Sequence, residues 1–138
     1  MSALETLYTS IYSALRNDTL WNDRVYPEIV PAQVIRPYVV FFVSSGGERN
    51  DLKRDDAEFT ISVKCVALQM ADAMAGASRI SALLNNQGSQ DGGTITGDAS
   101  WTITTIEQLR IIQQIEMISD DKPLYNSGHQ YNIVMEKL

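Results

Sequence analysis

The chain has 138 residues and a net charge of −6 at pH 7; 44% of its residues are hydrophobic and 20% are charged. This length and composition predict a single globular domain over residues 1–138, large enough to bury a core of its own. The acidic balance disfavours a protein that grips nucleic acid through clustered lysine and arginine, and the single cysteine, Cys65, excludes an intrachain disulfide.

Residues 3–16 predict an amphipathic helix. Apolar side chains recur in it at spacings of three and four, which places them on one stripe: Leu4, Leu7, Tyr8, Ile11, Tyr12 and Leu15. Ser2 and Glu5 have the S-x-x-E spacing of a capping box, in which the two side chains satisfy backbone N–H groups at the start of a helix. We expect the helix to end at Asn17-Asp18.

Two extended segments follow. Residues 21–31 contain VYPEIV, and Pro27 and Pro31 cannot donate hydrogen bonds to a neighbouring strand. This segment therefore predicts an edge strand or an irregular arm. Residues 37–45 predict a strand whose centre, YVVFFV, is apolar on both faces. Such a strand is covered on both sides by its own chain, or on one side by a partner chain.

A charged segment, GGERNDLKRDD at residues 46–56, separates this strand from the next one. Eight of the eleven residues from Glu48 to Glu58 are charged, with both signs present, and we predict a long loop over residues 46–58. Residues 58–66 then alternate between polar and apolar side chains, which predicts a half-buried antiparallel strand. Its inward residues are Phe59, Ile61, Val63 and Cys65.

A second helix is predicted over residues 69–85. Its apolar stripe consists of Met70, Met74, Ala77, Ile80, Ser81 and Leu84. Gly76, in the middle of this helix, costs about 1 kcal/mol relative to alanine, and we attribute it to close packing on the sheet.

The C-terminal third predicts further strands separated by turns. The segment NNQGSQDGG at residues 85–93 has the composition of a flexible turn. Strands are expected at residues 94–96, 100–107, 111–119 and 131–136, with a turn at residues 120–128.

Together these elements predict an α+β fold, in which two helices pack on one face of an antiparallel sheet. The expected core consists of Leu7, Ile11, Leu15, Phe59, Ile61, Val63, Ile80 and Leu84.

The sequence contains no recognisable catalytic constellation. His129 is the only histidine, in the predicted turn, and Cys65 is expected to be buried, so neither a zinc site nor a Cys–His pair is predicted. The carboxylate pairs Asp55-Asp56 and Asp120-Asp121 lie in predicted loops, which favours solvated turns over acid–base chemistry. We therefore expect no enzyme activity, no cofactor and no metal, and no apolar run approaches the roughly 18 residues of a membrane span.

The charged segment is the candidate functional site. Mixed charges suit a contact between identical neighbours, in which the basic side chains of one copy meet the acidic side chains of the next. The residues proposed for this contact between subunits are Arg49, Asp51, Lys53, Arg54, Asp55 and Asp56. A head-to-tail contact of this kind can close into a ring. The alternative, a solvated loop without a partner, is equally compatible with the sequence.

Several segments together resemble the tail-terminator, or tail-completion, proteins of long-tailed bacteriophages. They are the N-terminal helix, the stretch RVYPEIVPAQVIRPYVVFFVSSGGER, the strand FTISVKCVA, the helix MADAMAGASRISALL and the last strand GHQYNIVMEKL. The feature most typical of that family is R-V-Y-P at residues 24–27, followed by P-Y-V-V at residues 37–40 and a small-residue end to the strand. The element order agrees over nearly the whole chain, whereas residues 88–99 and 119–128 depart from the family pattern.

The resemblance implies structural work in a virion. Proteins of that family form hexameric rings on the head-proximal end of the tail tube, where they stop tube growth and face the head connector. The implied partners are other copies of this chain, the tail tube protein and the head–tail connector, with DNA passing through the ring without specific binding. The alternatives are a head-side connector or neck ring and, in another class, a small ligand-binding α+β domain.

Overall fold

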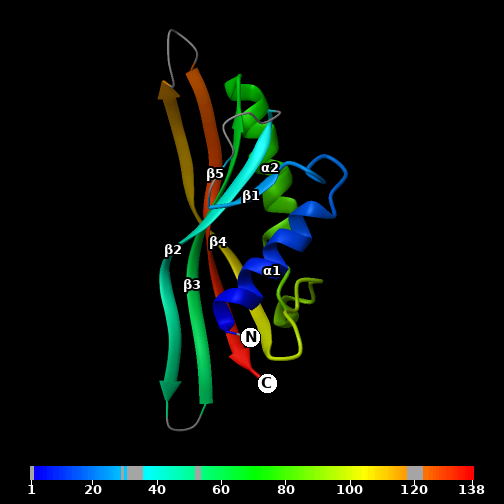
Figure 1. The fold of residues 1–138 in the computed structure, drawn as a ribbon, viewed down its shortest axis with the longest axis vertical. Helices are drawn as coiled ribbons and strands as arrows, with labels where there is room; N and C mark the ends of the chain where they lie inside the picture. Colours follow the sequence, from blue (N-terminus) through cyan, green and yellow to red (C-terminus); the bar gives the residue numbers. More distant parts are fainter. Residues whose placement is uncertain (1, 29, 31–35, 52–53, 118–122) are drawn as a thin grey trace.

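The computed structural model describes residues 2–28, 30, 36–51, 54–117 and 123–138 (Figure 1). In chain order the elements are α1 (Ala3–Arg16), β1 (Val25–Pro27), β2 (Tyr38–Asp51), β3 (Arg54–Ala67), α2 (Met70–Leu84), a short 3-10 turn η1 (Ser89–Asp91), β4 (Trp101–Met117) and β5 (Pro123–Lys137). The predicted α+β class and both predicted helices are confirmed.

The five strands form one sheet in the order β1-β2-β3-β5-β4, and both helices lie on the same side of it (Figure 1). Two long antiparallel hairpins, β2–β3 and β4–β5, make up most of the sheet and are joined by the antiparallel pairing of β3 with β5. The sheet is antiparallel, as predicted, except at one edge, where β1 pairs in parallel with the start of β2. β1 is nevertheless the predicted short edge strand, and Pro27 ends it.

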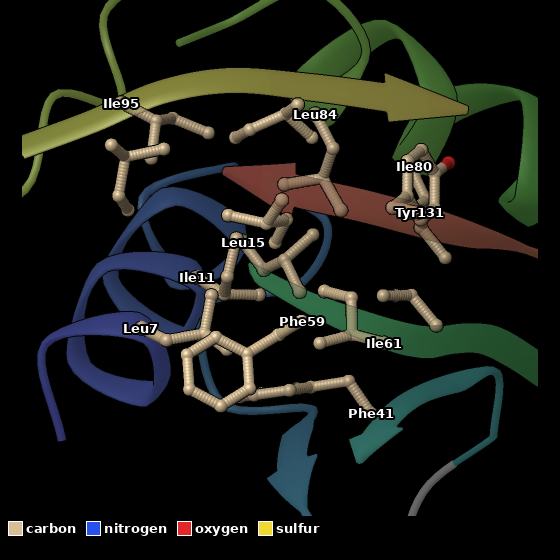
Figure 2. Close-up of a cluster of buried hydrophobic side chains, with 14 of the residues drawn as sticks. Leu7, Ile11, Leu15, Phe41, Phe59, Ile61, Ile80, Leu84, Ile95 and Tyr131 are labelled. Atoms are coloured by element: carbon tan, nitrogen blue, oxygen red, sulfur yellow. The ribbon is translucent and has the colours of Figure 1, made fainter. Parts of the chain in front are cut away.

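The main core lies between the sheet and the two helices. Figure 2 shows side chains from α1, α2 and the central strands pointing toward one another. All eight predicted core residues are buried, along with Trp21, Phe41 and Tyr131. The capping box is present in part: the Ser2 hydroxyl accepts a hydrogen bond from the Glu5 N–H at 3.2 Å and donates one to the Glu5 carboxylate. Leu4 lies at the edge of the α1 stripe and is 42% exposed.

Residues 38–41, the first part of β2, are covered on both faces by their own chain, which is one of the two predicted alternatives, whereas Phe42 is 36% exposed. Val39 and Phe41 point into the main core. Tyr38 and Val40 point to the opposite face, where they form a second apolar cluster with Val66 and with Leu124 of β5. The opposite-face cluster explains why both faces of the segment are apolar at residues 38–41, while Phe42 lies outside the cluster.

The helix α2 approaches the sheet closely at Gly76. A Cβ atom at this position would lie 2.3 Å from the Sγ of Cys65 and 3.3 Å from the ring of Trp21. The predicted close packing is confirmed, and it also rotates the buried stripe of α2 toward Ala73 and Gly76. Met74, which the sequence pattern placed in the stripe, is 50% exposed.

An ion pair ties α2 to the segment that follows α1. Arg79 donates to both carboxylate oxygens of Asp18, at 2.5 and 2.7 Å. These two hydrogen bonds hold the pKa of Asp18 below its usual value, despite an opposing effect of burial. A planar guanidinium that bonds both oxygens fixes direction as well as distance, so the pair sets how α2 meets the end of α1.

The C-terminal third differs most from the sequence prediction. Residues 94–96 form no strand, and only an isolated bridge joins Gly97 to Thr102. The two strands expected at 100–107 and 111–119 are one strand, β4, interrupted by register shifts at Ile103/Thr105 and Gln108/Ile111. The turn expected at 120–128 was also wrong, because β5 begins at Pro123, while residues 120–122 lie outside the described residues.

We predict that truncating the core on either side of the helix–sheet interface is costly. Ile11→Ala and Ile61→Ala each remove a side chain that is almost fully buried, and each should lower the free energy of unfolding by roughly 2–5 kcal/mol. Leu4→Ala, at an exposed position of the same helix, is the control and should cost less than either. Urea denaturation measures all three, and a cost below about 1 kcal/mol at both isoleucines would contradict the assigned core.

The contact at Gly76 predicts an inversion of the usual helix propensity. Alanine normally stabilises a helix interior by about 1 kcal/mol relative to glycine, so Ala75→Gly on the exposed face of α2 should destabilise. Gly76→Ala should also destabilise, because the new methyl group collides with Cys65. Thermal unfolding compares the two, and adding Cys65→Ala to Gly76→Ala should recover part of the loss. A stabilising Gly76→Ala would show that the contact is not tight.

Candidate assembly surface

The segment predicted as a charged loop is the end of the β2–β3 hairpin. β2 continues to Asp51 and β3 begins at Arg54, so the loop prediction for residues 46–58 was wrong. Lys53 lies outside the described residues. The end of the β2–β3 hairpin lies at one extremity of the long axis of the molecule, and the end of β4 and the start of β5 lie at the other (Figure 1).

The strand register brings most of the predicted contact residues together as opposite-charge pairs. Arg49 lies opposite Asp56, and Asp51 lies opposite Arg54, while Asp55 lies opposite Asn50. Opposite charges at directly opposed positions stabilise a strand pair. The order of the charges along the two strands therefore suits the hairpin itself, and contact with a neighbouring subunit is a separate proposal.

Two other carboxylates, on Glu48 and Glu58, connect the charged half of the hairpin to the rest of the chain. Glu48 accepts a hydrogen bond from the backbone N–H of Ala3 at 3.1 Å, where the unpaired N–H groups of α1 favour a negative charge. Glu58 accepts a hydrogen bond from the side-chain amide of Asn132 in β5, also at 3.1 Å. Sequence reasoning missed both anchors, because each joins residues far apart in the chain.

Gly46 allows the hairpin to bend. Its φ is +121°, and a Cβ atom would lie 2.2 Å from the carbonyl oxygen of Glu58. The register of β2 against β3 shifts between Val43 and Ser45, immediately before it. A bulge followed by a glycine is a usual way to turn a strand away from its sheet, and it separates the charged half of the hairpin from the half that packs under the helices.

The outer half of β4, residues 109–116, is a second exposed surface that the sequence analysis did not identify. β4 is the last strand of the sheet, and no described strand pairs with its outer side. Hydrogen bonds join Ile103 to Thr96 and Ile106 to Asn86 on that side, and the Gln108 N–H donates to Asn85, so the open edge begins after Gln108. Three large apolar side chains are exposed on it: Leu109 at 45%, Ile111 at 72% and Ile115 at 60%. The sequence predicts a strand here, but only the strand order shows that it is an edge.

A groove between α1 and β1 is the candidate site for a small ligand. It has a volume of about 640 Å³ and is lined by the tyrosines Tyr8, Tyr12 and Tyr26, with Arg16 beside them. The hydroxyl of Tyr8 is already engaged, since it donates to Glu28 at 2.6 Å and accepts from the Val43 N–H at 3.2 Å. The aromatic walls suit contact with apolar groups, while the polar atoms of Tyr8 serve the fold.

Cys65 and His129, for which the sequence predicted no catalytic or metal-binding role, both lie within strands of the sheet. Cys65 is buried, and burial raises the pKa of its thiol to about 12, so the thiolate is scarce at neutral pH. His129 lies within β5 opposite Val63, not in a turn, and burial lowers its pKa. Within the described residues, no three His, Cys, Asp or Glu side chains gather closely enough to hold a metal ion. No described helix combines the length and hydropathy that crossing a bilayer requires.

Comparisons with known proteins give a structural likeness. No family model and no curated protein sequence matches the chain. Among solved structures, a chain of the virion of a native gene transfer agent particle is similar, with a TM-score of 0.71 and 15% sequence identity, over 94% of this chain and 94% of that chain. The two chains thus share one fold over most of their length.

Proposed function

We propose that the chain is a structural virion protein that forms a ring at the head-proximal end of a phage-type tail tube. There it ends tube polymerisation and joins the tail to the head connector, without enzymatic activity. The observation that carries the proposal is the likeness in fold, over most of the chain, to a chain of a gene transfer agent virion. The terminator role, the homohexamer and the tail or neck position rest on the sequence resemblance to tail-terminator proteins.

The shape of the molecule suits a protein with two different contact faces. The end of the β2–β3 hairpin lies at one extremity, and the end of β4 with the start of β5 lies at the other (Figure 1). The two faces of a head-to-tail ring are never equivalent, so one can bind the last ring of tube protein while the other meets the connector. The acidic balance of −6 suits a channel through which DNA passes without adhering.

We predict that the charges of the hairpin end contribute to assembly. The triple variant Arg49→Glu, Lys53→Glu and Arg54→Glu should weaken ring formation, which light scattering and electron microscopy measure. Single exposed ion pairs contribute only roughly 0–1 kcal/mol, so the combined change is the fair test.

The strand register supplies a control for that experiment. The triple variant also places like charges opposite Asp56 and Asp51, which could disturb the hairpin alone. Exchanging one pair, Arg49→Asp with Asp56→Arg, keeps the charges opposite each other but reverses the pattern that a neighbour meets. If both variants form normal rings, the hairpin charges serve only the hairpin; if only the triple variant fails, the defect is internal.

Particles assembled without the protein test the role itself. We expect separate heads and tails, with tubes of uncontrolled length, because nothing would stop tube polymerisation. Purified protein added to growing tubes should then restore a defined end. Joined tails of normal length would contradict the terminator role, and filled heads that leak DNA beside normal tails would favour a head-side neck ring.

A further inference from the structure

The outer half of β4 lacks the features that normally prevent two edge strands from pairing. Such features are lysine, proline, bulges and covering loops. Both register shifts of β4 lie before Ile111, and residues 111–116, IIQQIE, contain no lysine, proline or glycine. Ile111 and Ile115 are the most exposed isoleucines of β4. An edge with regular geometry and exposed apolar side chains can receive another strand.

The two faces of this segment have different chemistry. Ile111 and Ile115 pair with His129 and Tyr125 of β5, on the side of the sheet that carries the helices. On that side, Gln113 contacts the first residue of α2 through a hydrogen bond to the Met70 sulfur at 3.3 Å.

The charged residues lie on the opposite face. The Glu116 carboxylate lies 3.8 Å from the ammonium group of Lys64. Lys64 lies between the buried Val63 and Cys65 in β3, so its side chain points to the face away from the helices. Arg110 lies in the bulge across from Gln130, whose neighbour Tyr131 points into the core. Arg110 and Glu116 therefore share the face away from the helices.

The sequence of the segment is self-complementary when it is paired with itself in the antiparallel direction. Centred on Gln113, such a pairing puts Arg110 opposite Glu116 and Ile111 opposite Ile115, each of them twice. Opposed residues of an antiparallel pair lie on the same face, so the charges meet on one face and the isoleucines on the other. A twofold contact of this kind repeats every favourable pair.

We propose that residues 111–115 of β4 pair antiparallel with the same residues of a second copy of this chain, about a twofold axis at Gln113. At each end of this pairing, Arg110, in the bulge of one copy, faces Glu116 of the other. The two five-stranded sheets then form one continuous sheet through the dimer. This contact is independent of the proposed ring contact, because it uses the opposite edge of the sheet and has twofold instead of head-to-tail symmetry.

A cysteine at the axis tests the geometry directly. The variant Gln113→Cys puts two thiols at directly opposed positions, where Cα atoms lie about 4.5–5.5 Å apart, within the range that a disulfide spans. It should cross-link under mild oxidation. Glu107→Cys, exposed on the same strand, is the control: the two copies of residue 107 would lie roughly 40 Å apart in this dimer. The native Cys65 is fully buried.

A charge exchange tests the pairing without a covalent bond. Arg110→Glu puts like charges opposite each other twice, and should weaken the dimer roughly tenfold in sedimentation velocity at low salt. Adding Glu116→Arg restores the opposite-charge pairs and should restore the dimer, with circular dichroism confirming that each variant folds.

Three outcomes overturn the proposal: equal cross-linking of the two cysteine variants, failure of the double variant to recover, or a wild-type chain that stays monomeric at every concentration. Cross-linking of Gln113→Cys alone, together with recovery by charge exchange, supports it.

Discussion

The position of β3 constrains the rest of the structure. This strand lies in the middle of the sheet, and its alternating face of Phe59, Ile61, Val63 and Cys65 is buried under the helices. Because α2 must come close enough for its backbone at Gly76 to meet Cys65, the helix cannot carry a side chain at that point. The ion pair of Arg79 with Asp18 then fixes α2 against the segment after α1. The buried core thus holds the helix layer on the sheet, and the close contact at Gly76 and the ion pair at Asp18 add to its placement.

Local periodicity was sufficient to predict which residues of α1 and β3 form the core. The stripe of α1 and the alternation of β3 each depend on neighbours within a few residues. Their predicted core residues are buried, although Leu4 is 42% exposed and Ser62, expected to face outward, is buried. The exposure of Met74 shows the limit of that reasoning: the pattern of apolar residues allows a stripe with methionine or a stripe with Ala73 and Gly76. Only the contact with Cys65 decides between them.

The extent of the hairpins could not be predicted in the same way. Glycines and charges between residues 46 and 56 are local signals for a loop, and they were interpreted as one. The pairing of Arg49 with Asp56 and of Asp51 with Arg54 depends on the register set by the apolar pairs before them. The same holds for β4, where a bulge at Gln108/Ile111 was taken for a break between two strands. Cross-strand register is a property of two segments together, and neither segment shows it alone.

The two edges of the sheet offer different kinds of contact to a neighbouring copy. At one edge β1 pairs with only Val39–Phe41 of β2, and the remainder of β2 leads to the charged hairpin end. At the other edge β4 presents a segment complementary to itself. A twofold contact joins two copies and then leaves no further edge of the same kind, so it cannot by itself close a ring of more than two subunits. A chain with both features can hold its apolar edge covered in a dimer while its charged end stays accessible. Ring formation then requires a contact that the dimer does not use, and the opposite location of the hairpin end on the sheet satisfies that condition.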